Sequence, residues 1–327
     1  MAFTRRTTHV APATAESIAA AAACLRAGGL VAMPTETVYG LAADATSDAA
    51  VAGIYAAKGR PTFNPLIAHV LDVAAARRQG AFTPEADKLA EAFWPGPLTL
   101  VAPAAPSCRV SLLARAGLDT LAIRVPAHET ARALIEAAQT PLVAPSANRS
   151  GRVSPTTAAH VLADLEGRVD LILDSGPSRH GLESTIVACL VQGPTLLRPG
   201  AIAREAIEGV LQAPLAVRDK ATRAPNAPGQ LQSHYAPRAR VRTEATDVES
   251  DEAALDFAGA LAESAAAARL DLSPNGDLVE AASNLFAYLR ALDETGAPRI
   301  AAAPVPHRGL GAAINDRLKR AAASREA

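Results

Sequence analysis

The residues LVAMPTETVYGL, at positions 30–41, give the strongest single indication of the fold. They begin with a short apolar run typical of a buried strand, and polar residues follow at once. In open α/β sheets, ligands bind in the crevice outside the ends of the strands. The hydroxyls and the carboxylate of this segment could therefore orient a small polar substrate. Alternatively, Thr35 and Thr37 could simply cap the next segment in an ordinary turn.

The same pattern continues outward from this segment, since short apolar runs alternate with Ala-rich helical patterns from Leu30 to about Leu211. Such alternation predicts an α/β sheet with helices packed on it. We expect a first surface helix capped near Thr14, rather than an export signal. The expected strands are 30–33, 66–70, 98–102, 120–125, 142–144, 171–173, 184–189 and 195–197, and the expected helices are 48–57, 84–93, 129–138, 156–165 and 203–211.

The length of 327 residues suits two domains. We expect a larger α/β domain over 14–211, a Pro-rich linker or functional loop over 212–240, and a small C-terminal α/β domain over 241–327. The expected elements of the last domain are a strand around Val241, helices over 252–268 and 278–292, a strand over 299–303, and a final helix from Ala312.

Charge and composition exclude several classes of protein. The 32 Lys and Arg residues balance 33 Asp and Glu residues, so the chain has no overall attraction to nucleic acid. The three cysteines lie far apart, which argues against a disulfide framework or a zinc site. No stretch approaches the roughly 20 apolar residues of a membrane span. We therefore expect a cytoplasmic protein that does not enter membranes, with its chemistry in local clusters.

Four more polar motifs lie at the ends of predicted strands. KGRPTFNPL at 58–66 suits phosphate oxygens, although a solvated basic turn is the usual fate of such a loop. PSANRSG at 145–151, ESTIV at 183–187 and LRPG at 197–200 repeat the pattern. One such motif is turn chemistry, whereas five at one sheet edge indicate a site. The glycine motifs of P-loop and dinucleotide-binding proteins are absent, so scattered cations and hydroxyls would have to hold any nucleotide.

Together with WPGPLT at 94–99, these motifs resemble the YrdC-type threonylcarbamoyl-adenylate synthase family over about residues 14–211. The segments APG at 227–229, HYAP at 234–237 and GLGAAINDRL at 309–318 resemble the two-domain form of that family. The resemblance implies a catalytic domain over 14–211, with a twisted, mixed open sheet and flanking helices. It also implies that the linker over 212–240 crosses the active site and leads to a smaller Rossmann-like α/β domain.

The resemblance also implies an activity and a site. The activity is a nucleotidyltransferase reaction of ATP, L-threonine and bicarbonate, with Mg²⁺ held through ATP rather than by protein side chains. The product would pass to a transferase that modifies tRNA beside the anticodon, and tRNA binding by this chain itself is not required. The implied signature residues are Lys58, Arg60, Ser146 and Asn148; the L-threonine contacts are Thr37, His69, Arg124, Ala144 and Ser184; and the ATP contacts are Arg60, Asn64, Thr120, Ser146, Ser154, Arg198 and Tyr235.

Three alternatives stay open at this point. A basic concave surface could bind RNA backbone in place of ATP. The same fold could use another acceptor, as do the related domains that adenylate carbamoyl phosphate in hydrogenase maturation. The C-terminal unit could bind a ligand of its own, or it could serve only to pack and to anchor the linker.

Overall fold

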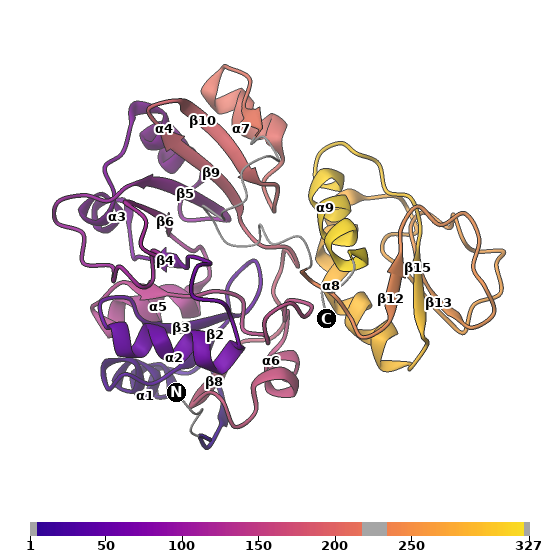
Figure 1. Cartoon of the computed structure of the whole chain (residues 1–327), viewed down its shortest axis with the longest axis horizontal. Coiled ribbons are helices and arrows are strands. Elements are labelled where there is room, and N and C mark those ends of the chain that lie inside the picture. Colours follow the sequence, from indigo (N-terminus) through magenta and orange to yellow (C-terminus); the bar gives the residue numbers. More distant parts are fainter. Residues whose placement is uncertain (1–4, 218–233, 324–327) are drawn as a thin grey trace.

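The computed structural model describes residues 5–217 and 234–323 and contains two α/β domains, each built on its own sheet (Figure 1). The larger sheet is mixed and carries helices on its faces, which confirms the predicted fold class. The segment APG at 227–229 lies outside the described residues, as does most of the expected linker.

The larger sheet has its strands in the order β1-β8-β2-β3-β7-β4-β6-β5-β9-β10-β11. Parallel pairs such as β4 with β6 alternate with antiparallel pairs such as β2 with β3. The strands are β1 (His9–Pro12), β2 (Val31–Met33), β3 (Gly40–Asp44), β4 (Ile67–His69), β5 (Leu98–Pro103), β6 (Thr120–Arg124), β7 (Leu142–Val143), β8 (Leu171–Asp174), β9 (Thr185–Leu190), β10 (Gly193–Arg198) and β11 (Ala216–Val217).

The helices of this domain largely follow the predictions. Thr14 caps the first helix through a capping box with Ser17, because each side chain accepts a hydrogen bond from the other residue's backbone N–H. The helices are α1 (Ala15–Arg26), α2 (Asp48–Lys58), α3 (Val73–Gln79), α4 (Pro84–Phe93), α5 (Glu129–Ala138), α6 (Ala158–Leu165) and α7 (Arg204–Leu211). The sequence prediction missed β1, β3, α3 and β11, which are short elements without clear periodicity.

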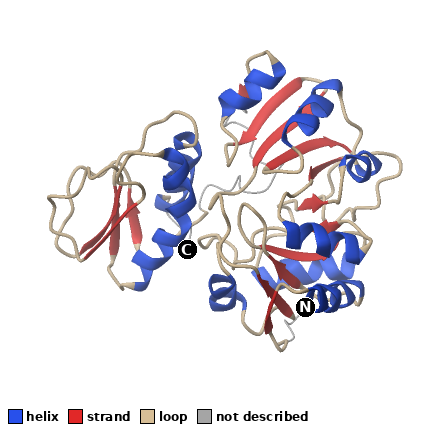
Figure 2. Cartoon of the chain, turned by 180° about the vertical axis from the view of Figure 1, so that it is seen from behind, coloured by secondary structure: helices blue, strands red, loops and turns tan. Residues whose placement is uncertain are grey.

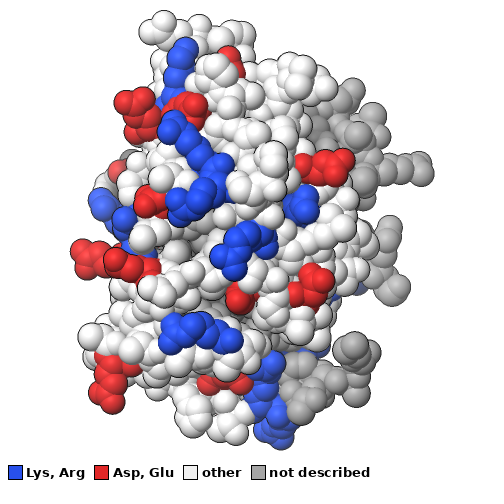
Figure 3. Space-filling view, turned by 90° about the vertical axis from the view of Figure 1, so that its left-hand side faces the viewer, with Lys and Arg blue, Asp and Glu red and all other residues white. Residues whose placement is uncertain are grey.

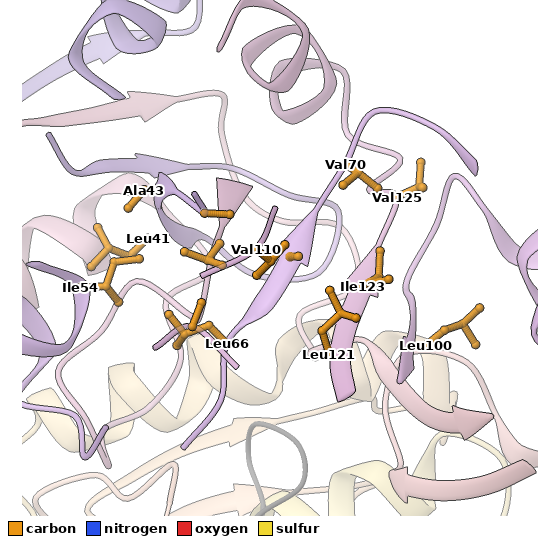
Figure 4. Packing of buried hydrophobic residues seen from close by; sticks show 14 of the residues in the cluster. Leu41, Ala43, Ile54, Leu66, Val70, Leu100, Val110, Leu121, Ile123 and Val125 are labelled. Atoms are coloured by element: carbon orange, nitrogen blue, oxygen red, sulfur yellow. The ribbon is translucent and has the colours of Figure 1, made fainter. Parts of the chain in front are cut away.

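Small aliphatic side chains fill the core between the sheet and its helices (Figure 4). Leu41 of β3 and Ile54 of α2 are fully buried in one cluster, which continues along the sheet to Leu66, Ile123 and Leu100. Burial of such side chains is the main favourable term in folding. The polar strand ends next to this core are therefore held on a rigid support.

The smaller domain contains four parallel strands in the order β12-β15-β13-β14. Its elements are β12 (Arg240–Arg242), β13 (Glu252–Asp256), β14 (Ala268–Asp271), α8 (Leu278–Glu294), β15 (Arg299–Ala302) and α9 (Gly311–Ala322). The helix expected over 252–268 was wrong. All five residues of β13 are buried between two neighbouring strands, and its alanines fit that space regardless of their helix propensity.

Helices α8 and α9 lie on the side of the small sheet that faces the larger domain (Figures 1 and 2). A doubly wound Rossmann sheet carries helices on both faces, so the Rossmann-like detail of the prediction is not confirmed. The two domains meet closely here. Gly181 has φ +64°, and a Cβ at this position would lie 2.2 Å from the carbonyl oxygen of Ser283 in α8. A glycine at this position thus allows the domains to touch.

Candidate active site

The five polar motifs converge on one pocket, together with the end of the linker. The space inside, its open mouth included, is about 510 Å³, which is within the usual range for small-molecule sites. Its lining residues are Thr35, Thr37, Val38, Gly40, Arg60, Ile67, His69, Arg124, Ala144, Pro145, Ser146, Glu183, Ser184, Arg198, His234 and Tyr235. Nine of the residues that the resemblance implied are among them: Thr37, Arg60, His69, Arg124, Ala144, Ser146, Ser184, Arg198 and Tyr235.

One end of the pocket is organised around Arg124, at the end of β6. Its Nη2 donates to Glu36 Oε1 at 2.5 Å, and its Nη1 donates to Thr37 Oγ1 at 2.9 Å. Its Nε donates to the carbonyl oxygen of Gly96 at 3.2 Å. Burial alone would raise the pKa of Glu36, but the Arg124 guanidinium lowers it to about 2. These bonds use three of five N–H groups, so Arg124 is fixed in place and can still bind an anion.

His69 lies beside Arg124 at the end of β4, where the register pairs the two residues. Burial lowers the pKa of His69 to about 3, and the nearby positive charge of Arg124 acts in the same direction. Its Nδ1 is 3.1 Å from the carbonyl oxygen of Ile67, which can only accept, so Nδ1 carries the proton. His69 is thus a neutral imidazole at neutral pH, and its Nε2 can accept a hydrogen bond.

This burial predicts a dependence of stability on pH. In the unfolded chain His69 takes up a proton near pH 6.5, whereas in the folded chain it stays neutral down to about pH 3. The contribution to stability is therefore complete above pH 6.5 and is lost as the pH falls toward 3. In His69→Asn, whose amide can keep the bond to Ile67, the slope of unfolding free energy between pH 6 and 4.5 should fall by about 1.4 kcal/mol per pH unit.

Urea unfolding at several pH values measures this slope. The wild-type chain is the reference, because two other histidines with a lowered pKa, the half-buried His160 and the buried His234, remain in both proteins. An unchanged slope in the variant would mean that His69 binds its proton equally in the folded and unfolded states.

The other end of the pocket is cationic. Arg60 donates from Nε to the carbonyl oxygen of Asn64 at 3.3 Å and from Nη2 to that of Pro65 at 3.1 Å. Arg198 donates from Nη2 to the carbonyl oxygen of Ser184 at 2.8 Å. Burial lowers the pKa of Arg60 to about 10. Both side chains therefore stay charged at neutral pH, and their rigid placement suits the oxygens of a polyphosphate.

Gly200 permits the close approach that places Arg198. A Cβ at Gly200 would lie 2.5 Å from the carbonyl oxygen of Glu183, a distance that real side chains do not reach. The next residue, Ala201, donates its N–H to the same carbonyl at 3.0 Å. The motif at 197–200 therefore packs directly against the motif at 183–187. This close contact requires a glycine at position 200.

Five of the implied residues do not line the pocket: Lys58, Asn64, Thr120, Asn148 and Ser154. Lys58 is buried, and its Nζ donates to the carbonyl oxygen of Ser146 at 2.5 Å and to that of Asn148. Asn148 Nδ2 in turn donates to the carbonyl oxygens of Arg149 and Arg152. The described bonds of Lys58 therefore hold the loop that presents Ser146, while contact of Lys58 with phosphate stays a prediction.

The other three residues surround the pocket in different ways. Asn64 is fully buried, and its side-chain amide has no hydrogen-bond partner among the described residues. Thr120 begins β6, where it pairs with Pro103 of β5. Ser154 donates from Oγ to Glu183 Oε1 at 2.6 Å.

Two carboxylates were missed as named site residues: Glu183, which lines the pocket, and Glu36, which pairs with the lining residue Arg124. Their signal was present in the sequence, since both stand inside the quoted motifs. Each is buried and pairs with an arginine, Glu36 with Arg124 and Glu183 with Arg317. Their partners are distant in sequence, so their role in orienting cations could not be read locally.

No group of three or more His, Cys, Asp or Glu residues that could hold a metal ion occurs in residues 5–217 and 234–323. In the same part of the chain, no helix is long and apolar enough to cross a membrane. One face of the molecule shows basic and acidic side chains interspersed, without a stripe of one sign (Figure 3).

The fold and pocket define a class of protein: an α/β enzyme with a pocket at the strand ends of an open sheet, lined by Arg124 with its side-chain network and by Arg60 and Arg198 as further cations. A family model described as "Telomere recombination" matches residues 23–200, and one described as "Threonylcarbamoyl-AMP synthase, C-terminal domain" matches residues 202–323. The chain belongs to the threonylcarbamoyl-AMP synthase family, in its two-domain form.

Individual relatives agree with this assignment over nearly the full chain. A threonylcarbamoyl-AMP synthase of Pyrococcus abyssi is 42% identical over 321 residues, which cover 93% of this chain and 94% of the relative. One of Bacillus subtilis is 42% identical over 337 residues, covering 94% and 93%. The crystal structure of P. abyssi Sua5 complexed with L-threonine has a TM-score of 0.87 at 38% identity, covering 97% of both chains.

Proposed function

We propose that this chain is an L-threonylcarbamoyladenylate synthase, which converts L-threonine, bicarbonate or CO₂, and ATP into threonylcarbamoyl-AMP and pyrophosphate. The observation that carries the proposal is the division of one pocket into two anion sites, around Arg124 and around Arg60 with Arg198. An amino acid and a nucleotide that must react with each other need such neighbouring sites. The family of the chain supports the same reaction.

At the Arg124 end, we assign the carboxylate of L-threonine to the guanidinium N–H groups that Glu36 and Thr37 leave over. The neutral imidazole of His69 is an acceptor for the amine or the hydroxyl of the substrate. Ala144 donates its own N–H to Ile67, so only its carbonyl oxygen is left for the substrate. Ser184 bonds to Thr99 at 2.7 Å, which fixes its hydroxyl at the border between the two sites.

At the cationic end, we assign the phosphates of ATP to Arg60, Arg198 and the Ser146 loop that Lys58 holds. Tyr235 closes this end, with its buried ring in the lining of the pocket. Its hydroxyl has no hydrogen-bond partner among the described residues. A buried phenol needs a partner, so we assign its O–H to the nucleotide.

The reaction then has two steps. The amine of threonine adds to CO₂, or displaces water from bicarbonate, and forms a carbamate. A carbamate oxygen attacks the α-phosphorus of ATP, and the bond to pyrophosphate breaks. Both reactants are anions, so the enzyme has to neutralise charge and align the groups, which needs no nucleophilic side chain. His234 and Tyr235, at the described end of the linker, line the pocket and would keep water from the labile adenylate.

The partners of two buried carboxylates indicate how Mg²⁺ would be held. Glu36 and Glu183 are each engaged by an arginine, so neither is left as an oxygen ligand of its own. We therefore assign Mg²⁺ to the phosphates and water, where it neutralises charge. The product would serve cytoplasmic tRNA modification through a separate transferase.

The test is pyrophosphate release from ATP and bicarbonate by the purified chain, with L-threonine compared with L-serine, L-valine and no amino acid. We expect strong dependence on L-threonine, and about 10- to 200-fold lower kcat/KM for L-serine, which lacks only a methyl group. No release with any amino acid would refute the proposal and would favour the RNA-binding or alternative-acceptor interpretation. RNA binding would also show as affinity that falls steeply with salt.

A further inference from the structure

One side chain of the C-terminal domain reaches the wall of the pocket. Arg317 lies in α9, is fully buried, and donates from Nε to Glu183 Oε2 at 3.0 Å. Its Nη1 donates to the carbonyl oxygen of Pro199 at 2.8 Å. Both partners belong to the larger domain, in the motifs at 183–187 and 197–200. Arg317 therefore holds together the two segments that place Arg198.

Glu183 links Arg317 to the nucleotide end of the pocket. Its second oxygen accepts from Ser154 Oγ at 2.6 Å, so the carboxylate bridges Arg317 and Ser154. Burial would raise the pKa of Glu183, but the Arg317 guanidinium, with Arg198, keeps it lowered. Glu183 thus stays ionised, and both of its oxygens are committed to positioning.

The same guanidinium supports Tyr235. Its central carbon lies 5.2 Å from the centre of the Tyr235 ring, which also stacks on Phe286 of α8 at 5.4 Å. Tyr235 has φ +61°, a left-handed conformation that costs free energy for an aromatic residue and persists only where surroundings impose it. Helices α8 and α9 supply those surroundings, so the C-terminal domain determines where the ring lies.

A second arginine acts nearby. Arg290 of α8 donates to the carbonyl oxygen of Val153 and pairs with Asp164 at 2.7 Å. Arg290 thus fixes the backbone of the segment that carries Ser154. The Ser154 hydroxyl is fixed by Glu183, which is itself held by Arg317 of the C-terminal domain. Burying an ion pair removes both charges from water, which costs more hydration free energy than burying apolar side chains. Packing of the two domains alone therefore does not account for these buried arginines.

We propose that Arg317 is a positioning residue of the adenylation reaction, which fixes Glu183, Ser154 and Tyr235 in the geometry that binds ATP. This inference rests on the proposed function. It makes the C-terminal domain part of the nucleotide site, and it gives the motif at 309–318 a role. The L-threonine end of the pocket is held by Glu36, Thr37 and Gly96, and none of its described bonds involves Arg317.

The experiment uses the full chain and compares wild type with Arg317→Met, Arg317→Lys and Arg299→Ala. Arg299 is the matched control, because its ion pairs stay within the same domain, with Glu249 and Asp251 at the surface and with Glu252, which keeps Arg242 as a second partner. Steady-state pyrophosphate release gives KM for ATP and for L-threonine separately, and thermal unfolding reports folding. We expect Arg317→Met to raise KM for ATP by about 10- to 100-fold with KM for L-threonine within about twofold.

If Arg317→Met fails to fold, Arg317→Lys tests whether Arg317 positions the ATP site. A lysine keeps the charge but loses the fork that reaches Glu183 and Pro199 together, so an intermediate rise in KM for ATP is expected. A merely structural role would lower the unfolding temperature and the amount of active enzyme without moving KM for ATP, and that result in the lysine variant would overturn the inference. Inactive wild-type protein would instead refute the proposed function.

Discussion

Replacing Arg60 with alanine will reduce threonine-dependent pyrophosphate release by about 10²- to 10³-fold, to the background of most assays. The reason is that Arg60 holds a fixed guanidinium inside the pocket, to which we assigned the reacting phosphates. Its removal should leave the fold intact, since its described bonds go only to backbone carbonyls of its own loop, and no buried carboxylate loses its partner. Pyrophosphate release at saturating L-threonine measures the effect, and thermal unfolding checks the fold.

Two variants sharpen this test. Arg60→Lys keeps the charge without the two-pronged geometry, so its activity should lie between wild type and Arg60→Ala. Arg77→Ala removes an exposed arginine that pairs with Asp87 at the surface of the same domain, and it should behave as wild type. Full activity in Arg60→Ala would exclude this site as the place of adenylation.

The sequence could predict most of the larger domain because its signals are local. The end of β2 at Met33 is marked by an apolar run, and the helices α4 and α5 match the predicted bounds residue by residue. The motifs converge because neighbouring strands end at one edge of the sheet, a consequence of the fold class. For this reason the pocket was predictable before the individual contacts were.

The errors arose where tertiary contacts override local preference. The run from Glu252 to Ala268 is rich in alanine, and its first five residues form a strand because the sheet buries them on both faces. The Glu183 to Arg317 pair joins residues 134 positions apart. No spacing rule links such positions, so the sequence showed the two motifs but not that they meet.

The bonds of Lys58 could not be predicted locally for a related reason. Two cations in a loop predict phosphate binding, but a loop that must present Ser146 also needs a donor for its own carbonyl groups. The structure gives Lys58 that second task, with Nζ within 2.5 Å of the Ser146 carbonyl oxygen. Composition alone does not separate a cation that meets the ligand from one that holds the loop around it.

Arg124 is the position where binding and stability are coupled most tightly. In Arg124→Met, Glu36 loses its only described ion-pair partner while it stays buried. An unpaired buried carboxylate costs about 3 to 5 kcal/mol of unfolding free energy, or forces the group to take up a proton. We therefore expect a large loss of stability in urea unfolding, together with a loss of L-threonine saturation in the pyrophosphate assay.

The double variant Arg124→Met with Glu36→Gln separates the two effects. It removes both charges, so most of the lost stability should return, because the introduced amide needs only neutral hydrogen bonds, such as the one that the His128 N–H donates to Glu36 Oε2 at 3.3 Å. Binding of L-threonine should not return, since the cation for its carboxylate is still missing. If the double variant recovered both stability and saturation by L-threonine, Arg124 would serve only to neutralise Glu36, and the amino acid would have to bind through the other arginines of the pocket.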